Sequence, residues 1–323
     1  MLFASDALLL LVGALAIDAL FGDPPWLWRR LPHPIVLMGA VIDTLDRLLN
    51  HECHSSHRRR LAGVVSTVAL IVGAGGAGYL AEAGLRRIPG GEFLLAGVAA
   101  IFIAQRSLYD HVARVHAAFG EGGLAAARNA VAMIVGREPS TLDESGVCRA
   151  AIESCAENFS DGVVAPAFWF ALFGLPGLLI YKIINTADSM VGHRTARHEA
   201  YGWAAARLDD GLNLIPARLS SMLLALSAPI AGGTVTTSLA VIWRDARKHR
   251  SPNAGWPESA MAGALGIALA GPRQYAERRL DDPFLHEGGR RNADADDIRR
   301  ALHVFVGACA LQAAAYALLA ALF

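Results

Sequence analysis

The sequence predicts an all-α integral membrane protein, a polytopic bundle of about four to six crossing helices joined by helical cytoplasmic loops. Its 323 residues are 54% hydrophobic and only 18% charged, and the mean hydropathy is +0.37. These values lie outside the usual range of soluble domains. Six apolar runs also approach the roughly 20 residues that a membrane-crossing helix needs. These runs cover residues 3–21, 61–83, 93–105, 163–185, 212–232 and 301–323. We expect one membrane-embedded domain over residues 1–323, and we interpret the first run as a retained membrane segment rather than a signal peptide.

Three of the runs are imperfect, because the third is short and the fourth and fifth contain helix breakers. The interruptions are Gly174, Pro176 and Gly177 in the fourth run, and Pro216, Arg218 and Pro229 in the fifth. Broken backbone at membrane depth is tolerated only where it is buried in protein or lines water. The sequence therefore predicts that these two segments are broken or re-entrant.

Basic residues give an orientation. Lys and Arg concentrate in the stretches 22–60, 106–162 and 233–300. If all six runs cross, the positive-inside rule places these stretches in the cytoplasm and residues 186–211 outside. With the fourth and fifth segments re-entrant, residues 186–211 return to the cytoplasmic side, and we favour this alternative. The formal net charge of zero argues against a nucleic-acid partner, and four scattered cysteines indicate neither a zinc site nor a disulfide framework.

Two polar clusters bracket the fourth apolar run. The entry cluster contains Glu153, Glu157, Asn158 and Asp161, and the exit cluster contains Lys182, Asn185, Asp188 and Ser189. Three carboxylates at four-residue spacing line one face of a helix, and carboxylate and amide oxygens suit Mg²⁺. A solvated face at a helix start is the alternative interpretation of the entry cluster alone. The exit cluster favours a nucleotide site, because ionisable groups next to hydrocarbon cost at least about 2.5 kcal/mol and persist mainly where they are paired or functional.

Weaker motifs keep two interpretations each. Asp23 and His33 form a rigid polar turn that suits either a binding site or a helix stop. Arg137, His193 and Arg194 suit anion binding or an ordinary charged surface. The turn-rich stretch 243–266 predicts a shaped binding loop or a basic anchor at lipid headgroups. Three further segments have one preferred interpretation each. Gly73, Gly75 and Gly78 predict close helix packing rather than a dinucleotide loop. Residues 106–130 predict an amphipathic helix, and residues 281–300 predict a solvated loop.

Taken together, the motifs have a family resemblance. DALFGDPPW at 18–26, HP at 33–34, ESCAENFSDGVVAP at 153–166, YKIINTADSMVGH at 181–193, ARLDDGLNLIPARL at 206–219 and SPNAGWPESAMAGALG at 251–266 occur in that order. The chain resembles the CobD/CbiB family of cobalamin biosynthesis, the adenosylcobinamide-phosphate synthases. The resemblance implies an ATP- and Mg²⁺-dependent ligase of the bacterial inner membrane. Such an enzyme joins adenosylcobyric acid, a corrinoid, to aminopropanol or its phosphate.

The resemblance, combined with the clusters, implies a role for each residue. Glu157, Asp161 and Asp188 bind the metal, and Arg137, Asn158, Asn185 and Ser189 bind ATP. Lys182 and Arg194 supply positive charge, and Glu153 or His193 is the base. Asp23, His33, Asn253, Trp256 and Glu258 bind substrate. We expect the active site to face the cytoplasm, and a homo-oligomer or other cobalamin-assembly enzymes stay open as partners besides the lipid bilayer.

Two other classes of function stay open. A noncatalytic membrane regulator of the AmpE type would keep the helices but lose the polar clusters. A small-molecule transporter also has broken helices and intramembrane charge. The long cytoplasmic stretches with turn-rich loops favour an enzyme.

Overall fold

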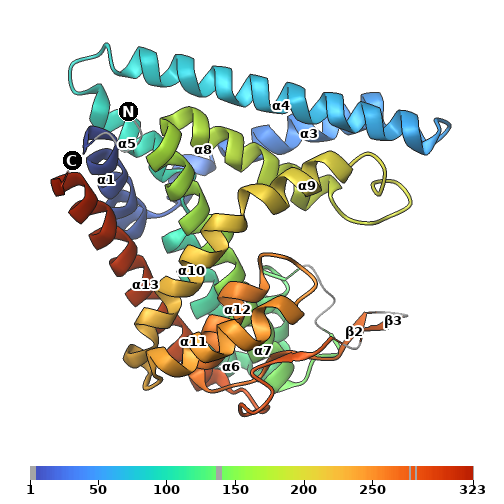
Figure 1. The fold of residues 1–323 in the computed structure, drawn as a ribbon, viewed down its shortest axis with the longest axis vertical. Helices are drawn as coiled ribbons and strands as arrows, with labels where there is room; N and C mark the ends of the chain where they lie inside the picture. Colours follow the sequence, from blue (N-terminus) through green and yellow to red (C-terminus); the bar gives the residue numbers. More distant parts are fainter. Residues whose placement is uncertain (1–4, 136–139, 276–277, 281, 323) are drawn as a thin grey trace. The chain divides into compact units, whose positions relative to one another are not determined.

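The computed structural model describes residues 5–135, 140–275, 278–280 and 282–322 (Figure 1). This part of the chain is 76% helical with almost no strands, which confirms the all-α prediction. The chain divides into two compact units. Unit 1 comprises Met1–Ala104, Ala165–Asn213 and Tyr316–Phe323, and unit 2 comprises Gln105–Val164 and Leu214–Ala315.

Unit 1 is built from the N-terminal helices and from the bent helix α8. Its elements are α1 (Ser5–Phe21), α2 (Pro25–Trp28), α3 (Pro34–Leu49), α4 (Ser56–Leu85), α5 (Gly91–Ala100), α8 (Ala165–Val191) and α9 (Trp203–Leu212). Helix α8 packs against α1, α3, α4, α5 and α9. The core of this region contains Ile42, Leu70, Ile184 and Tyr201, from α3, α4, α8 and the loop before α9. Helix α8 is the central element of the unit, because it packs against five of its other helices.

Unit 2 contains the remaining helices and two short sheets. Its elements are α6 (Gln105–Val131), α7 (Glu144–Phe159), the π-helical turn η1 (Ser160–Val164), α10 (Leu214–Ser227), the 3₁₀ turn η2 (Ala228–Ala231), α11 (Val235–Asp245), the 3₁₀ turn η3 (Ala246–Lys248), α12 (Gly255–Leu265), β1 (Leu269–Ala270), β2 (Arg273–Tyr275), β3 (Arg278–Leu280), β4 (Phe284–Leu285) and most of α13 (Ala295–Leu322). Strand β1 pairs antiparallel with β4, and β2 pairs antiparallel with β3. Helix α12 packs on α7, α10 and α11, and its small residues allow this close packing.

Within the described residues, five helical segments are long and apolar enough to cross a membrane. They are Ser56–Leu85, Gly91–Val131, Glu144–Val191, Leu214–Ala231 and Ala295–Leu322. This number agrees with the predicted polytopic bundle. The first apolar run forms α1, whose 17 residues fall short of the 18 that define these segments.

Helix α8 is broken at the predicted place. Gly174 has φ 64° and ψ −153°, a conformation that favours glycine, and Pro176 follows inside the helix. A Cβ atom on Gly177 would lie 2.5 Å from the carbonyl oxygen of Trp169. Eight residues of straight helix would separate these positions by about 12 Å, so the chain doubles back here, and Figure 1 shows α8 as a bent helix. The second half, Leu175–Val191, begins at a cap, because the Leu175 N–H donates to Oε2 of Glu82 at 2.9 Å.

The fifth apolar run, residues 212–232, is interrupted in a different way from α8. Pro216 lies in the first turn of α10, where a missing N–H does no harm. The α-helix ends at Ser227, and Pro229 sits in the first turn of the 3₁₀ segment that follows. The break in this segment is therefore a change of helix type at Pro229.

Two of the three glycines in the motif at residues 73–78 pack α4 against α8, as predicted. A Cβ atom on Gly75 would lie 3.1 Å from Cδ1 of Ile180, and one on Gly78 would lie 2.7 Å from Cα of Pro176. Around Gly73 a Cβ atom would meet nothing within 4 Å. The small residues thus bring α4 next to the bend of α8.

Outside these helices, one expectation is confirmed and one is wrong. The amphipathic helix predicted for residues 106–130 is α6, which buries Leu108, Val112 and Val115 but is kinked by non-helical backbone at Gly122 and Gly123. The stretch 281–300 is not simply a solvated loop, because Leu285 and Asp297 are buried. Asp297 Oδ2 pairs with Nη2 of Arg290 at 2.6 Å, and a buried carboxylate with such a partner orders the entry into α13.

Candidate functional site

Unit 1 contains a carboxylate and amide cluster where α8 meets α9. We define the α8–α9 cluster as Asn185, Asp188, Asp209, Asp210 and Asn213. Asn185 donates from Nδ2 to Oδ1 of Asp209 at 3.2 Å, and Asn213 donates from Nδ2 to Oδ2 of Asp209 at 3.1 Å. The hydroxyl of Tyr181 donates to Oδ1 of Asn213 at 3.0 Å. Both oxygens of Asp209 are thus held in a buried network, which orients the amide of Asn185 beside them.

Asp188 lies one turn beyond Asn185, near the end of α8, and is half-buried. A Cβ atom on Gly192 would collide with the Asp188 carboxylate. Glycine at position 192 therefore leaves room for this carboxylate. Ser189, which is exposed, donates from its hydroxyl to the carbonyl oxygen of Asn185 at 3.0 Å. Lys182 lies on the same helix and is half-buried.

The electrostatics of the cluster centre on Asp209. Burial and the negative charge of Asp188 raise the pKa of Asp209 to about 7, although hydrogen bonds from Asn185 and Asn213 oppose the rise. Asp210 instead pairs with Arg207, with 3.2 Å between Oδ2 and Nη1. The cluster therefore contains one carboxylate that changes charge near neutral pH.

Replacement of Asp209 by asparagine tests this proton linkage. The folded pKa lies above the ordinary value of 3.8, so the folded state binds the extra proton. Stability should then fall as the pH rises from about 4 to about 7. We expect the thermal unfolding midpoint in detergent to decline over this window in the wild type and to decline less in Asp209→Asn. The substitution Asp43→Asn, at a half-exposed position on α3, is the control and should keep the wild-type slope. Equal slopes in wild type and Asp209→Asn would contradict the assignment.

The loop after α8 carries His193 and Arg194, which are both exposed. Residues just beyond them anchor the loop to α3 and α4. Arg197 Nη2 lies 2.8 Å from Oδ2 of Asp46, and the Arg59 guanidinium donates to the carbonyl oxygen of Arg197. Burial raises the pKa of Asp46, but hydrogen bonds from Arg197, Asn50 and His198 outweigh it and hold the pKa below 3.8. The loop is therefore fixed at its base.

The entry cluster lies in unit 2, at the end of α7. Glu153 is buried, and its Oε1 accepts a hydrogen bond from the Ala270 N–H at 2.8 Å. Glu157 and Asn158 are exposed, and Asp161 is half-buried in the π-helical turn. Asn158 donates from Nδ2 to the carbonyl oxygen of Ser154 at 2.9 Å. The four-residue spacing is helical as predicted, but exposure differs along it: Glu153 faces the protein interior and Glu157 the surface.

The residues predicted to bind substrate form two groups, one in each unit. In unit 1, Asp23 Oδ1 lies 3.4 Å from Nε2 of His33. His33 also caps α3, since its Nδ1 accepts from the Ile35 N–H at 3.2 Å. The motif therefore lies between the end of α1 at Phe21 and the capped start of α3, which agrees with the helix-stop interpretation. Substrate binding by Asp23 and His33 stays a prediction.

In unit 2, Asn253 lies in the loop before α12, and Trp256 and Glu258 lie in the first turn of α12. Arg218 of α10 donates to Oδ1 of Asn253 at 2.9 Å, and its guanidinium lies 4.3 Å from the Trp256 ring centroid. Glu258 is buried, with Oε1 3.8 Å from Nε2 of His249. Arg218 thus ties two of the three predicted residues to α10.

Asp209, Asn213, Tyr181 and Arg218 are the residues that we did not assign from the sequence. All four lie within quoted motifs, at 181–193 and 206–219. The signal that could have identified Asp209 and Asn213 is an acidic pair and an asparagine next to an apolar run, the same pattern that marked the other clusters.

The chemistry of these donors suits Mg²⁺ in combination with phosphates. Among the described residues, no group of three or more His, Cys, Asp or Glu side chains is placed to hold a metal ion. Mg²⁺ in phosphate-transfer sites commonly uses only one or two carboxylates, with waters and substrate phosphates completing its shell. Each cluster fits that requirement within its own unit. Arg137 lies outside the described residues.

Comparison with known proteins gives the family. The protein-family model described as CobD/Cbib protein matches residues 11–305 of this chain. The chain is 50% identical over 318 residues to the cobalamin biosynthesis protein CobD of Rhizobium meliloti (strain 1021), with 97% of each chain covered. It is 48% identical over 301 residues to the protein of that name from Brucella anthropi, and 48% identical over 299 residues to that from Rhodobacter capsulatus, with 92% of each chain covered. No solved structure matches. Since the match runs in order across nearly the whole sequence, the chain belongs to the CobD/CbiB family.

Proposed function

We propose that the protein is the ATP-dependent ligase of cobalamin biosynthesis that joins adenosylcobyric acid to aminopropanol or its phosphate. The observation that carries the proposal is 50% identity across 97% of a relative named cobalamin biosynthesis protein CobD. The carboxylate and amide clusters in the polar segments support it, because an anchor or a simple scaffold has no use for them.

The reaction requires activation of a carboxylate. A carboxylate oxygen of the corrinoid attacks the γ-phosphorus of ATP, and the bond to the ADP oxygen breaks. The amine then attacks the acyl carbon, and phosphate leaves with the former carboxylate oxygen. The amine nitrogen loses its proton to a base, for which Glu153 and His193 are the candidates. One ATP is thus converted to ADP and phosphate for each amide formed.

Each cluster has a part in this scheme. Mg²⁺, when bound, neutralises the charge on the phosphates. Its proposed ligands are Glu157, Asp161 and Asp188, with Asn158, Asn185, Ser189 and Arg137 on the nucleotide. Lys182 and Arg194 stabilise charge that develops on the transferred phosphoryl group.

Substrate recognition and location complete the proposal. Asp23, His33, Asn253, Trp256 and Glu258 contact the corrinoid or the amine. The protein lies in the bacterial inner membrane, with these residues facing the cytoplasmic pools of ATP and amine. The five apolar helical segments support the membrane location.

A reconstitution assay tests the activity. Purified protein in detergent, given adenosylcobyric acid, ATP, Mg²⁺ and either amine, should form the amide and ADP in equal amounts. The preferred amine identifies the natural one. Absence of amide with both amines, in protein with an intact unfolding transition, would refute the ligase function and favour a regulator or a transporter.

A further inference from the structure

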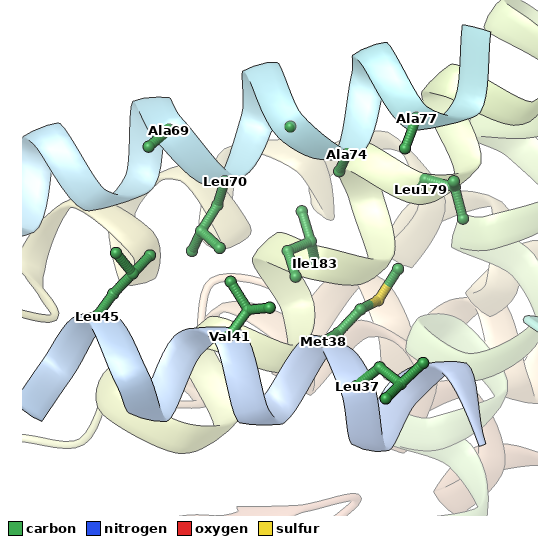
Figure 2. A pocket seen from close by; sticks show the side chains of 11 residues that line it. Leu37, Met38, Val41, Leu45, Ala69, Leu70, Ala74, Ala77, Leu179 and Ile183 are labelled. Atoms are coloured by element: carbon green, nitrogen blue, oxygen red, sulfur yellow. The ribbon is translucent and has the colours of Figure 1, made fainter. Parts of the chain in front are cut away.

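An apolar groove in unit 1 lies outside the proposed reaction. It runs between α3 and α4, with α8 at its base, and its volume is about 460 Å³. Figure 2 shows Leu37, Val41 and Leu45 of α3 below the groove, Ala74 and Ala77 of α4 above it, and Ile183 between the two helices. We call it the α3–α4 groove. Its volume lies within the range of small-molecule sites.

The lining of the groove selects the kind of occupant. Every side chain that lines it is apolar, and apart from Met38 each is aliphatic or a glycine. A nucleotide, a corrinoid with its amide groups, or an extended peptide would bury polar atoms without partners there, at a cost of about 1–3 kcal/mol each. A hydrocarbon chain meets no such cost.

The surroundings of the groove indicate a source for that chain. Helix α4 is one of the segments able to cross a membrane, and only 28% of its apolar window is buried. Its outer face exposes Val65, Val68 and Val72. The groove therefore continues into a surface that itself suits lipid tails.

Charge at one end of α4 indicates the type of lipid. Arg58 and Arg60 are exposed in the first two turns of the helix, and the helix N-terminus adds positive potential. Arg58 precedes Ala69, at one end of the groove, by about 16 Å of helix. This separation suits a headgroup at the arginines and an acyl chain in the groove, and basic side chains of this kind attract anionic headgroups.

We propose that the α3–α4 groove binds one acyl chain of an anionic phospholipid, with the headgroup at the N-terminus of α4. The site would hold the lipid on the protein through purification. It would also fix the gap between α3 and α4, next to the second half of α8.

Gly73 allows a test with a matched control. A Cβ atom on Gly73 or on Gly76 would meet nothing within 4 Å, but only Gly73 lines the groove. Leucine at position 73 fills the groove, whereas leucine at position 76 places the same side chain elsewhere on α4. Delipidated protein is titrated with phosphatidylglycerol and with phosphatidylcholine, and bound lipid is counted by native mass spectrometry.

The wild type and Gly76→Leu should bind one phosphatidylglycerol at least tenfold more tightly than Gly73→Leu. Arg58→Gln should reduce the preference for phosphatidylglycerol over phosphatidylcholine. Equal binding by the two leucine variants would overturn the proposal. The proposal would also be overturned if the wild type and Gly76→Leu formed dimers and Gly73→Leu were monomeric, since the occupant of the groove would then be a second copy of the chain.

A second measurement uses the wild type alone and does not depend on how a variant folds. Phosphatidylglycerol with a photoreactive group in one acyl chain should crosslink to peptides that contain residues 37–45 and 69–77. Crosslinks confined to other segments would exclude the groove as the binding site.

Discussion

Replacement of Asp188 or Asp161 by asparagine is expected to lower the rate of ATP-dependent amide formation at least about 100-fold. Asparagine keeps the size of the side chain but removes the negative charge that a metal–phosphate complex needs. The space left by Gly192 for the Asp188 carboxylate accepts an amide of the same shape, so the fold should tolerate the change. The measurement is turnover of the purified variants at saturating ATP, compared with the wild type.

The control for these variants is Asp43→Asn. Asp43 lies on α3, half exposed, and pairs only with the neighbouring Arg47 among the ion pairs described. Its replacement should leave turnover and membrane insertion unchanged. Near-normal turnover in both Asp161→Asn and Asp188→Asn would refute the metal assignment while leaving the ligase function open.

Replacement of Glu82 by alanine is expected to destabilise the protein by about 1–3 kcal/mol. The Glu82 carboxylate accepts the Leu175 N–H at the bend of α8 and pairs with Arg86 at 2.8 Å. Alanine leaves that N–H without its acceptor at the start of the second half-helix, and removes a negative charge from a helix N-terminus. The measurement is the thermal unfolding midpoint in detergent.

Glutamine at position 82 distinguishes the contribution of the capping hydrogen bond from that of the negative charge. Glu82→Gln keeps an oxygen acceptor for Leu175 and should retain most of the stability lost in Glu82→Ala. Arg86→Gln removes only the exposed ion pair and should change stability by about 1 kcal/mol or less. If alanine and glutamine lower the midpoint equally, the capping hydrogen bond does not hold the bend. Since the second half of α8 carries Lys182 and Asp188, Glu82→Ala should also reduce turnover.

Local sequence signals predicted the helices and the break in α8. Apolar length predicts a helix directly, and Gly174 adopts a backbone conformation that few other residues tolerate. Gly75 and Gly78 likewise indicated close packing, because only small residues permit it. Such features depend on neighbours within a few residues along the chain.

Contacts between distant residues were not predictable in the same way. The cap on α8 comes from Glu82, 93 residues before Leu175, and the Asp46–Arg197 pair spans 151 residues. Asp209 was missed because its raised pKa arises from burial beside Asp188, a contact between two helices. The sequence shows which segments carry polar residues, but only the fold shows which of these residues share hydrogen bonds.

The path of one oxygen atom tests the ligase account most directly. Adenosylcobyric acid labelled with ¹⁸O in its free carboxylate is incubated with the protein, ATP, Mg²⁺ and the preferred amine, and the released phosphate is analysed by mass spectrometry. The account predicts one ¹⁸O atom in each phosphate, because the carboxylate oxygen attacks the γ-phosphorus and leaves with it. Amide formation with unlabelled phosphate, or without consumption of ATP, would contradict it.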